Sequence, residues 1–219
     1  MRKLIQGIIE FHQKRRDAVK DTFAKLALGQ KPDALFIACS DSRVAVNVFA
    51  STDPGDLFVI RNAGNLVTPA ETSSSDESEV AAIEFALESL RVGHIIVCGH
   101  SDCGAMKALC QGRLGLELPY LKHWLRHGDA ALKRVRESGG QMNPGEEVNE
   151  VSRQNVLLQM EHLLCYGQVS EREKDGKLAL HGLWFDIQNT DVYYANSRER
   201  QFRIIDGVNG PGILSELRS

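Results

Sequence analysis

The sequence predicts an α/β fold, in which a mainly parallel central sheet is flanked by helices. Short runs rich in β-branched and aromatic residues alternate along the chain with longer segments of helical periodicity, an order typical of a parallel sheet with helical crossovers. The first three runs are apolar on both faces, as strands buried inside a parallel sheet are. A chain of 219 residues is long enough for one domain with a well-buried core.

The first element is a helix over residues 4–28. Its spacing places Ile5, Ile8 and Ile9 on one face, which makes the helix amphipathic. The short apolar patch near the N-terminus is interrupted by polar residues and lacks a small-residue cleavage site. It is therefore expected to be a helix of the folded protein and not a signal peptide.

Six runs are predicted as strands because they are apolar and rich in β-branched or aromatic residues. They span 34–40, 56–62, 94–100, 178–187, 192–195 and 202–205. A Gly-containing polar segment between the third and fourth runs, residues 138–147, is typical of a surface loop and is too short to separate domains. We therefore expect all six strands to belong to one domain.

Two further helices are predicted between the strands. The first has a single apolar stripe, formed by Val80, Ile83, Leu87 and Leu90. Ser74 and Glu77 stand at capping-box spacing before it, and Gly93 is expected to mark its end. The second helix is predicted over residues 151–166, which also have helical spacing.

Charge and hydropathy exclude several classes of partner. The net charge is −3 and the isoelectric point is near 6.2, so neither nucleic acid nor an anionic membrane is an expected partner. No segment approaches the roughly 18 apolar residues that a transmembrane helix requires. The sequence thus predicts a soluble cytoplasmic protein.

The five cysteines do not form a disulfide pattern, because their number is odd and their spacing irregular. Free thiols or metal ligands are the expected use. Cys98 lies inside an apolar run and is interpreted as a core residue. Cys110 and Cys165 fall on helical patterns and are also expected to pack.

Possible metal ligands gather where two predicted strands end. Cys39 ends the first run and His100 the third, and the carboxyl ends of parallel strands share one edge of the sheet, where sites form. Cys103 follows three residues after His100. A Cys₂His set leaves one coordination position open, which is the catalytic arrangement of zinc, and its soft ligands favour zinc over magnesium, calcium or manganese.

The segment CSDSR adds a carboxylate and a guanidinium beside the first ligand. Asp41 and Arg43 alternate after Cys39, so they can pair next to the metal. An Arg-held carboxylate stays ionised and can orient a zinc-bound hydroxide, which forms because zinc lowers the pKa of water to about 7. An ordinary surface salt bridge is the alternative interpretation.

Three segments carry a family resemblance: ACSDSRV (38–44), GDLFVIRNAGNLV (55–67) and CGHSDCGAM (98–106). In this order and spacing the sequence resembles the β-class carbonic anhydrases of bacterial type, over about residues 20–190. The resemblance implies the β-carbonic anhydrase fold and a zinc lyase that interconverts carbon dioxide and bicarbonate. It implies Cys39, His100 and Cys103 as zinc ligands, and Asp41 with Arg43 as the catalytic dyad.

The resemblance also implies an assembly and a substrate pocket. The expected protein is a homodimer, often paired into a homotetramer, with the N-terminal helix packed on the partner subunit. Substrate contacts are implied for Gln30 through its amide, for Phe58 as an apolar wall and for Gly104. Asp41 is a possible fourth metal ligand in a closed state. From the sequence unaided, Gln30 is an ordinary loop residue and Phe58 a core residue.

The expected organisation is a single domain over residues 1–219. It comprises an N-terminal helical arm (1–30), a zinc-binding core (34–187), and C-terminal strands with a tail (188–219). His94, His123 and His127 are unranked candidates for proton export, and each is otherwise an ordinary surface or packing residue.

Two other functions fit the same pattern. A zinc hydroxide on this fold can hydrolyse carbonyl sulfide or carbon disulfide, whose linear molecules resemble carbon dioxide. Alternatively, the metal has a structural or regulatory role, with its fourth position permanently filled.

Overall fold

A computed structural model gives the structure of residues 1–70, 77–196 and 200–217. Within these residues six strands form one sheet in the order β2-β1-β3-β4-β5-β6. The strands are β1 (Ala34–Cys39), β2 (Leu57–Asn62), β3 (His94–His100), β4 (Ala179–Asp186), β5 (Asp191–Asn196) and β6 (Arg203–Ile204). The first four run parallel, and β5 and β6 are antiparallel. The predicted mainly parallel α/β fold is confirmed, and each predicted strand is correct to within one residue at either end.

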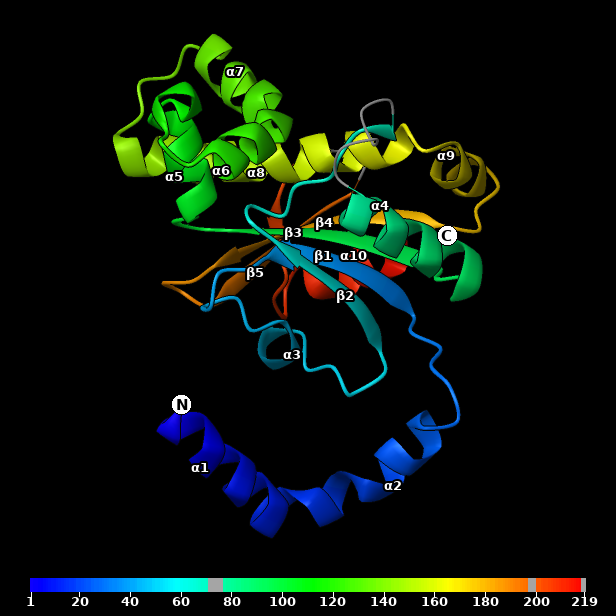
Figure 1. The fold of residues 1–219 in the computed structure, drawn as a ribbon. Helices are drawn as coiled ribbons and strands as arrows, with labels where there is room; N and C mark the ends of the chain where they lie inside the picture. Colours follow the sequence, from blue (N-terminus) through cyan, green and yellow to red (C-terminus); the bar gives the residue numbers. More distant parts are fainter. Residues whose placement is uncertain (71–76, 197–199, 218–219) are drawn as a thin grey trace.

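Helices cover both faces of the sheet (Figure 1). The helices are α1 (Arg2–Glu10), α2 (Arg16–Leu26), α3 (Val46–Phe49), α4 (Glu77–Glu84), α5 (Gly104–Cys110), α6 (Pro119–Trp124), α7 (Asp129–Glu137), α8 (Pro144–Leu164), α9 (Gly167–Lys174) and α10 (Gly210–Glu216). The largest apolar cluster joins α4 and α8 to one sheet face. A smaller cluster packs α3 against the opposite face, around Phe36 and Phe185.

The second predicted helix begins earlier than the sequence pattern indicated. Residues 144–147 were expected to be loop, but α8 starts at Pro144. Asn143 caps it: its side chain accepts from the amides of Gly145 and Glu146 at 3.0 Å, and Glu146 accepts from the amide of Asn143 at 2.9 Å. This reciprocal capping box, with proline at the first helical position, stabilises a start that apolar periodicity alone does not reveal.

The first predicted helix was expected to end at Gly93, and this position is wrong. Helix α4 continues as a π-helical turn over Phe85–Ser89 and stops there. The chain reverses at Arg91, which has a left-handed φ of 54°, because buried Val92 must turn back into the core before β3 begins. Ser74 of the proposed capping box lies outside the described residues. The tail also contains α10, which no sequence signal predicted.

The N-terminal arm is helical, as predicted, and stands apart from the sheet (Figure 1). Helices α1 and α2 are joined by a π-helical turn over Phe11–Arg15, and none of residues 2–26 is buried. Its apolar face is exposed within one chain, at Leu4, Ile5, Ile8, Ile9 and Phe11. In the part of the chain that the structure describes, no helix combines the length and the hydropathy needed to cross a bilayer.

Replacing Gly99 with alanine is expected to destabilise the protein by about 1–3 kcal/mol, the range for overpacked cores. Helix α8 crosses β3 so closely that a Cβ at Gly99 would lie 2.7 Å from Val156 Cγ2 and 3.2 Å from the Ser152 carbonyl oxygen. Urea unfolding would measure the loss. Gly93→Ala is the matched control, because its Cβ would meet nothing within 4 Å. Equal stability of the two variants would contradict the prediction.

The buried imidazole of His181 is expected to make stability depend on pH. Its Nε2 lies 3.0 Å from His94 Nδ1 and its Nδ1 3.2 Å from the Tyr194 hydroxyl. Burial first, and then neighbouring His94, lower the pKa of His181 from 6.5 to about 4. The unfolded chain therefore binds the proton more tightly, and stability is lost as pH falls from 6.5 towards 4.

This dependence can be measured as a difference in unfolding free energy. Between about pH 7.5 and about pH 5, His181 is expected to contribute a loss of about 2 kcal/mol. His181→Gln should reduce the fall by that amount, whereas the exposed control His123→Gln should not. If the unfolding free energy fell equally in the wild type, His181→Gln and His123→Gln, folding would not lower the pKa of His181.

Candidate metal centre

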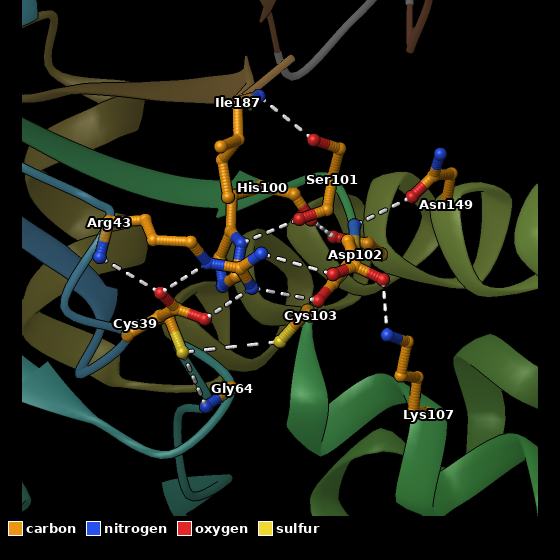
Figure 2. Close-up of polar contacts among 12 residues, drawn as sticks. Cys39, Arg43, Gly64, His100, Ser101, Asp102, Cys103, Lys107, Asn149 and Ile187 are labelled. Atoms are coloured by element: carbon orange, nitrogen blue, oxygen red, sulfur yellow. Dashed lines mark hydrogen bonds and ion pairs between the residues drawn. The ribbon is translucent and has the colours of Figure 1, made fainter.

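Two strand ends and one helix start bring the predicted ligands together. Cys39 is the last residue of β1 and His100 the last residue of β3, and these strands are parallel neighbours. After His100 the chain makes a short turn, and Cys103 then occupies the N-cap position of α5. The sequence-based placement of all three side chains at the carboxyl edge of the sheet is therefore correct (Figure 2).

The spacing of the ligand atoms fits one metal ion. The Sγ atoms of Cys39 and Cys103 are 4.0 Å apart, and with a His100 nitrogen they lie within 4.8 Å of one another. All three side chains are buried. Two sulfur ligands at about 2.3 Å from a tetrahedral zinc ion would be about 3.8 Å apart, so little movement is needed.

His100 presents a bare nitrogen to this cluster. Its Nδ1 lies 2.8 Å from the Ser101 carbonyl oxygen, and because a carbonyl only accepts, Nδ1 carries the proton. Nε2 is then an acceptor, yet it is buried and has no hydrogen-bond partner among the described residues. Metal-binding histidines are held in this way. The unpaired Nε2 is the strongest local sign that these residues fit a metal.

The two thiols differ in their environment. The Cys39 sulfur accepts from the Gly64 amide at 3.4 Å. The hydrogen bond between the two thiols lowers the pKa of Cys39 and raises the pKa of Cys103. One thiol of the pair therefore ionises readily, and the thiolate is the form that binds metal.

Gly64 itself is required at this point. It has a left-handed φ of 85°, and a Cβ there would lie 2.9 Å from Ala105 Cβ. A larger residue would push the amide away from the Cys39 sulfur.

Asp41 and Arg43 form the pair that the sequence predicted. Arg43 donates from Nε to Asp41 Oδ1 at 2.9 Å and from Nη2 to Oδ2 at 2.8 Å, while its backbone amide also donates to Oδ1 at 2.9 Å. These bonds hold the pKa of Asp41 well below its usual range. The Asp41 carboxylate beside the cluster is therefore ionised at neutral pH.

Two further residues, which the sequence patterns did not indicate, make contacts around this pair. Arg61 of β2 donates to the carbonyl oxygens of Cys39 at 2.8 Å and Asp41 at 2.9 Å, and so fixes the turn between them. Asp102 accepts from Arg43 Nη1 at 3.0 Å and pairs with Lys107; Lys107 and then Arg43 lower the pKa of Asp102. The sequence feature that could have identified Asp102 is its position between two predicted ligands, His100 and Cys103.

The predicted substrate residues do not all reach the centre within one chain. Gly104 follows Cys103 directly as the first residue of α5. Phe58, however, pairs with Leu35 of β1, whereas Cys39 pairs with Asn62. Phe58 therefore lies roughly 13 Å along β2 from the position that is level with Cys39. Gln30 lies in an exposed loop before β1. Both are towards the amino edge of the sheet.

The remaining cysteines and histidines lie outside the cluster. Cys98 is fully buried, and desolvation raises the pKa of its thiol to about 12, so the core interpretation is confirmed. Cys110 is half-buried, but Cys165 is exposed where α8 ends, and its predicted packing is wrong. His94 begins β3, the strand that His100 ends. His123 is exposed and His127 buried.

Comparison with known proteins gives a consistent result. The sequence model of the family described as Carbonic anhydrase matches residues 34–192. The carbonic anhydrase of Synechocystis sp. is 40% identical over 194 residues, which cover 88% of this chain and 70% of that protein. Among solved structures, the β-carbonic anhydrase CcaA has a TM-score of 0.88 and 36% identity, covering 94% of this chain and 92% of that one. A structure described as one of two tetrameric β-carbonic anhydrases from Sordaria macrospora has a TM-score of 0.71 and 31% identity, covering 88% and 92%.

Proposed function

Because the chain belongs to the β-class of the carbonic anhydrase family, we propose that it converts carbon dioxide and water reversibly to bicarbonate and a proton at a zinc ion. The ligands are Cys39, His100 and Cys103. The observation that carries this proposal is the buried Nε2 of His100, which lies beside two thiols and has no hydrogen-bond partner in the part of the chain that the structure describes. Thiolate and imidazole together favour zinc among the biological divalent metals.

The residues of the centre have distinct roles in the proposed reaction. When bound, zinc lowers the pKa of a coordinated water from about 15.7 to about 7. Cys39, His100 and Cys103 would hold the ion. Asp41, kept ionised by Arg43, would accept a hydrogen bond from the attacking water and orient its oxygen towards carbon dioxide. Addition of that oxygen to carbon dioxide would give bicarbonate, with the proton of the water released to buffer.

Asp41 is also the side chain proposed to fill the fourth position in a closed state. To do so it must leave Arg43, which in the structure holds both of its carboxylate oxygens. The orientation of Arg43 therefore sets the balance between the open and closed states.

The active enzyme is proposed to be a homodimer or homotetramer. The exposed apolar face of the arm supports this, because an apolar helix face of this kind is normally covered. In such an assembly Gln30 and Phe58 of the partner subunit would join Gly104 at the substrate.

We retain the division into an arm (1–30), a core (34–187) and a C-terminal part (188–219). The proposed setting is the cytoplasm, without a nucleic-acid or membrane partner, which agrees with the net charge of −3.

Stopped-flow carbon dioxide hydration, with zinc assayed on the same sample, tests the proposal. Fast turnover at one zinc ion per chain, between about pH 6.5 and about pH 9, is the expected result. Full zinc occupancy without hydration would refute it. Activity on carbonyl sulfide or carbon disulfide would then identify a sulfur-substrate hydrolase, and inactivity on all three substrates a structural zinc protein.

A further inference from the structure

The guanidinium of Arg43 makes as many hydrogen bonds with Asp102 as with the side chain of Asp41. Figure 2 shows the contacts of Arg43 with Asp102. Its Nη1 donates to the Asp102 carboxylate at 3.0 Å, and its Nη2 donates to the Asp102 carbonyl oxygen at 3.1 Å. Lys107, from α5, pairs with the same carboxylate. Four charges of alternating sign thus form a chain from Asp41 to Lys107.

We propose that Asp102, held in turn by Lys107, is a positioning residue that fixes the guanidinium of Arg43 against Asp41. The inference deepens the proposed function and rests on it, since it assigns what keeps Asp41 in the open, active orientation. Asp102 does not touch the substrate and acts only through Arg43.

The backbone of Asp102 makes it a fixed anchor. The residue has a left-handed φ of 56°, and its amide donates to Asn149 Oδ1 of α8 at 2.8 Å. It also lies between His100 and Cys103, so the turn that carries two proposed ligands carries the support of Arg43 as well. The position of Arg43 is therefore tied to the metal centre.

The guanidinium is held along two edges. Nε and Nη2 face Asp41, while Nη1 and Nη2 face Asp102, so four of its five N–H donors are used. Isolated exposed ion pairs contribute little, and the side chains of Arg43 and Asp102 are 43% and 52% exposed. Planar guanidinium contacts within a charge network are the exception. The expected effect is therefore on the orientation of Arg43 and not on global stability.

Two variants remove this support from different elements. Asp102→Asn removes the negative charge and keeps a residue that accepts a left-handed φ. Lys107→Met removes the partner of Asp102 on α5 and leaves the residues of the turn between His100 and Cys103 unchanged. It therefore tests the inference even if Asp102→Asn fails to fold. Lys177→Met is the matched control, because Lys177 forms a similar exposed pair with Asp175 at 2.8 Å. Lys107→Arg is the conservative rescue.

The first measurement does not depend on activity. In the purified full-length protein, hydrogen exchange of the Arg43 Nε–H group is followed by nitrogen-15 NMR, with the signal assigned by its loss in Arg43→Lys. Exchange is expected to be about fivefold faster in Asp102→Asn, the upper range for an exposed pair. It should also be faster in Lys107→Met, and unchanged in Lys177→Met and Lys107→Arg.

The second measurement is steady-state hydration by the zinc-loaded variants. The kcat is expected to fall about fivefold in Asp102→Asn with KM unchanged, because a larger fraction of molecules has Asp41 turned away from Arg43. If Lys107 acts through Asp102, the double variant should be no slower than Asp102→Asn alone.

Unchanged Arg43 exchange in both variants would overturn the inference, whatever the activity. Lower kcat with unchanged exchange would also overturn it, because the effect would then not pass through Arg43. An inactive wild-type protein would instead refute the proposed function, and the exchange rates would still decide whether Asp102 positions Arg43.

Discussion

Replacing His100 with alanine is expected to remove zinc from the protein and abolish carbon dioxide hydration. The substitution deletes the buried Nε2, which has no hydrogen-bond partner among the described residues and completes the cluster with two thiols. Groups that merely orient a metal ligand contribute roughly 10- to 100-fold in affinity or activity. Loss of one of three ligands should exceed this range.

Zinc content per chain and stopped-flow turnover of the same preparation would measure both effects. His123→Ala is the control, because this exposed histidine lies on α6, outside the cluster. Circular dichroism would establish that the variant is folded. A folded His100→Ala protein with full zinc and wild-type turnover would show that the metal lies elsewhere.

Replacing Asp41 with asparagine is expected to lower turnover by about 10²-fold, the cost of misplacing a reacting group, with zinc still bound. The variant keeps the shape of the side chain but loses the negative charge that Arg43 holds through two bonds at 2.9 and 2.8 Å. Because Asp41 is not one of the three ligands in the open state, metal content should not change.

The kinetic signature distinguishes this role from substrate binding. Asp41→Asn should lower kcat and kcat/KM by similar factors, as expected for an interaction made in the transition state. Asp175→Asn removes an exposed carboxylate that pairs with Lys177 and should leave both unchanged. If Asp41→Asn instead turned over at the wild-type rate, the pair would be no more than a surface ion pair.

The role of Asp41 also has a consequence for pH dependence. Arg43 lowers the pKa of this carboxyl, so its charge is present above the ordinary carboxyl range and is lost only as pH falls through a still lower value. Any change of rate between about pH 6.5 and about pH 9 must then come from another group, such as the water whose pKa zinc lowers to about 7.

The grouping of Cys39, His100 and Cys103 was predictable from the sequence because it depends on short-range rules. Cys39 and His100 each end an apolar run, and neighbouring parallel strands end at a common edge. Cys103 needs only the short turn after His100, and the apolar run around Cys98 identifies that thiol as core. Asp41 and Arg43 are two residues apart, so their pairing also follows from local spacing.

The remaining features depend on which distant segments meet. Asp102 and Arg43 are separated by 59 residues, and no spacing rule predicts that their side chains touch. Likewise, no spacing rule predicts that Arg61 of β2 donates to the carbonyl oxygens of Cys39 and Asp41 at the end of the neighbouring strand. The proton on His100 Nδ1 is fixed by one carbonyl oxygen, which only atomic positions reveal.

The sequence by itself therefore determined the parallel sheet, the grouping of the cysteine and histidine side chains proposed as ligands, and the Asp41–Arg43 pair. Only the tertiary structure decided how that pair is anchored, and that Gln30 and Phe58 lie towards the other edge of the sheet within one chain. The physical reason is the range of the interactions. Strand polarity and residue spacing are encoded locally, whereas hydrogen bonds between loops form only after the sheet and α8 have brought them within about 3 Å.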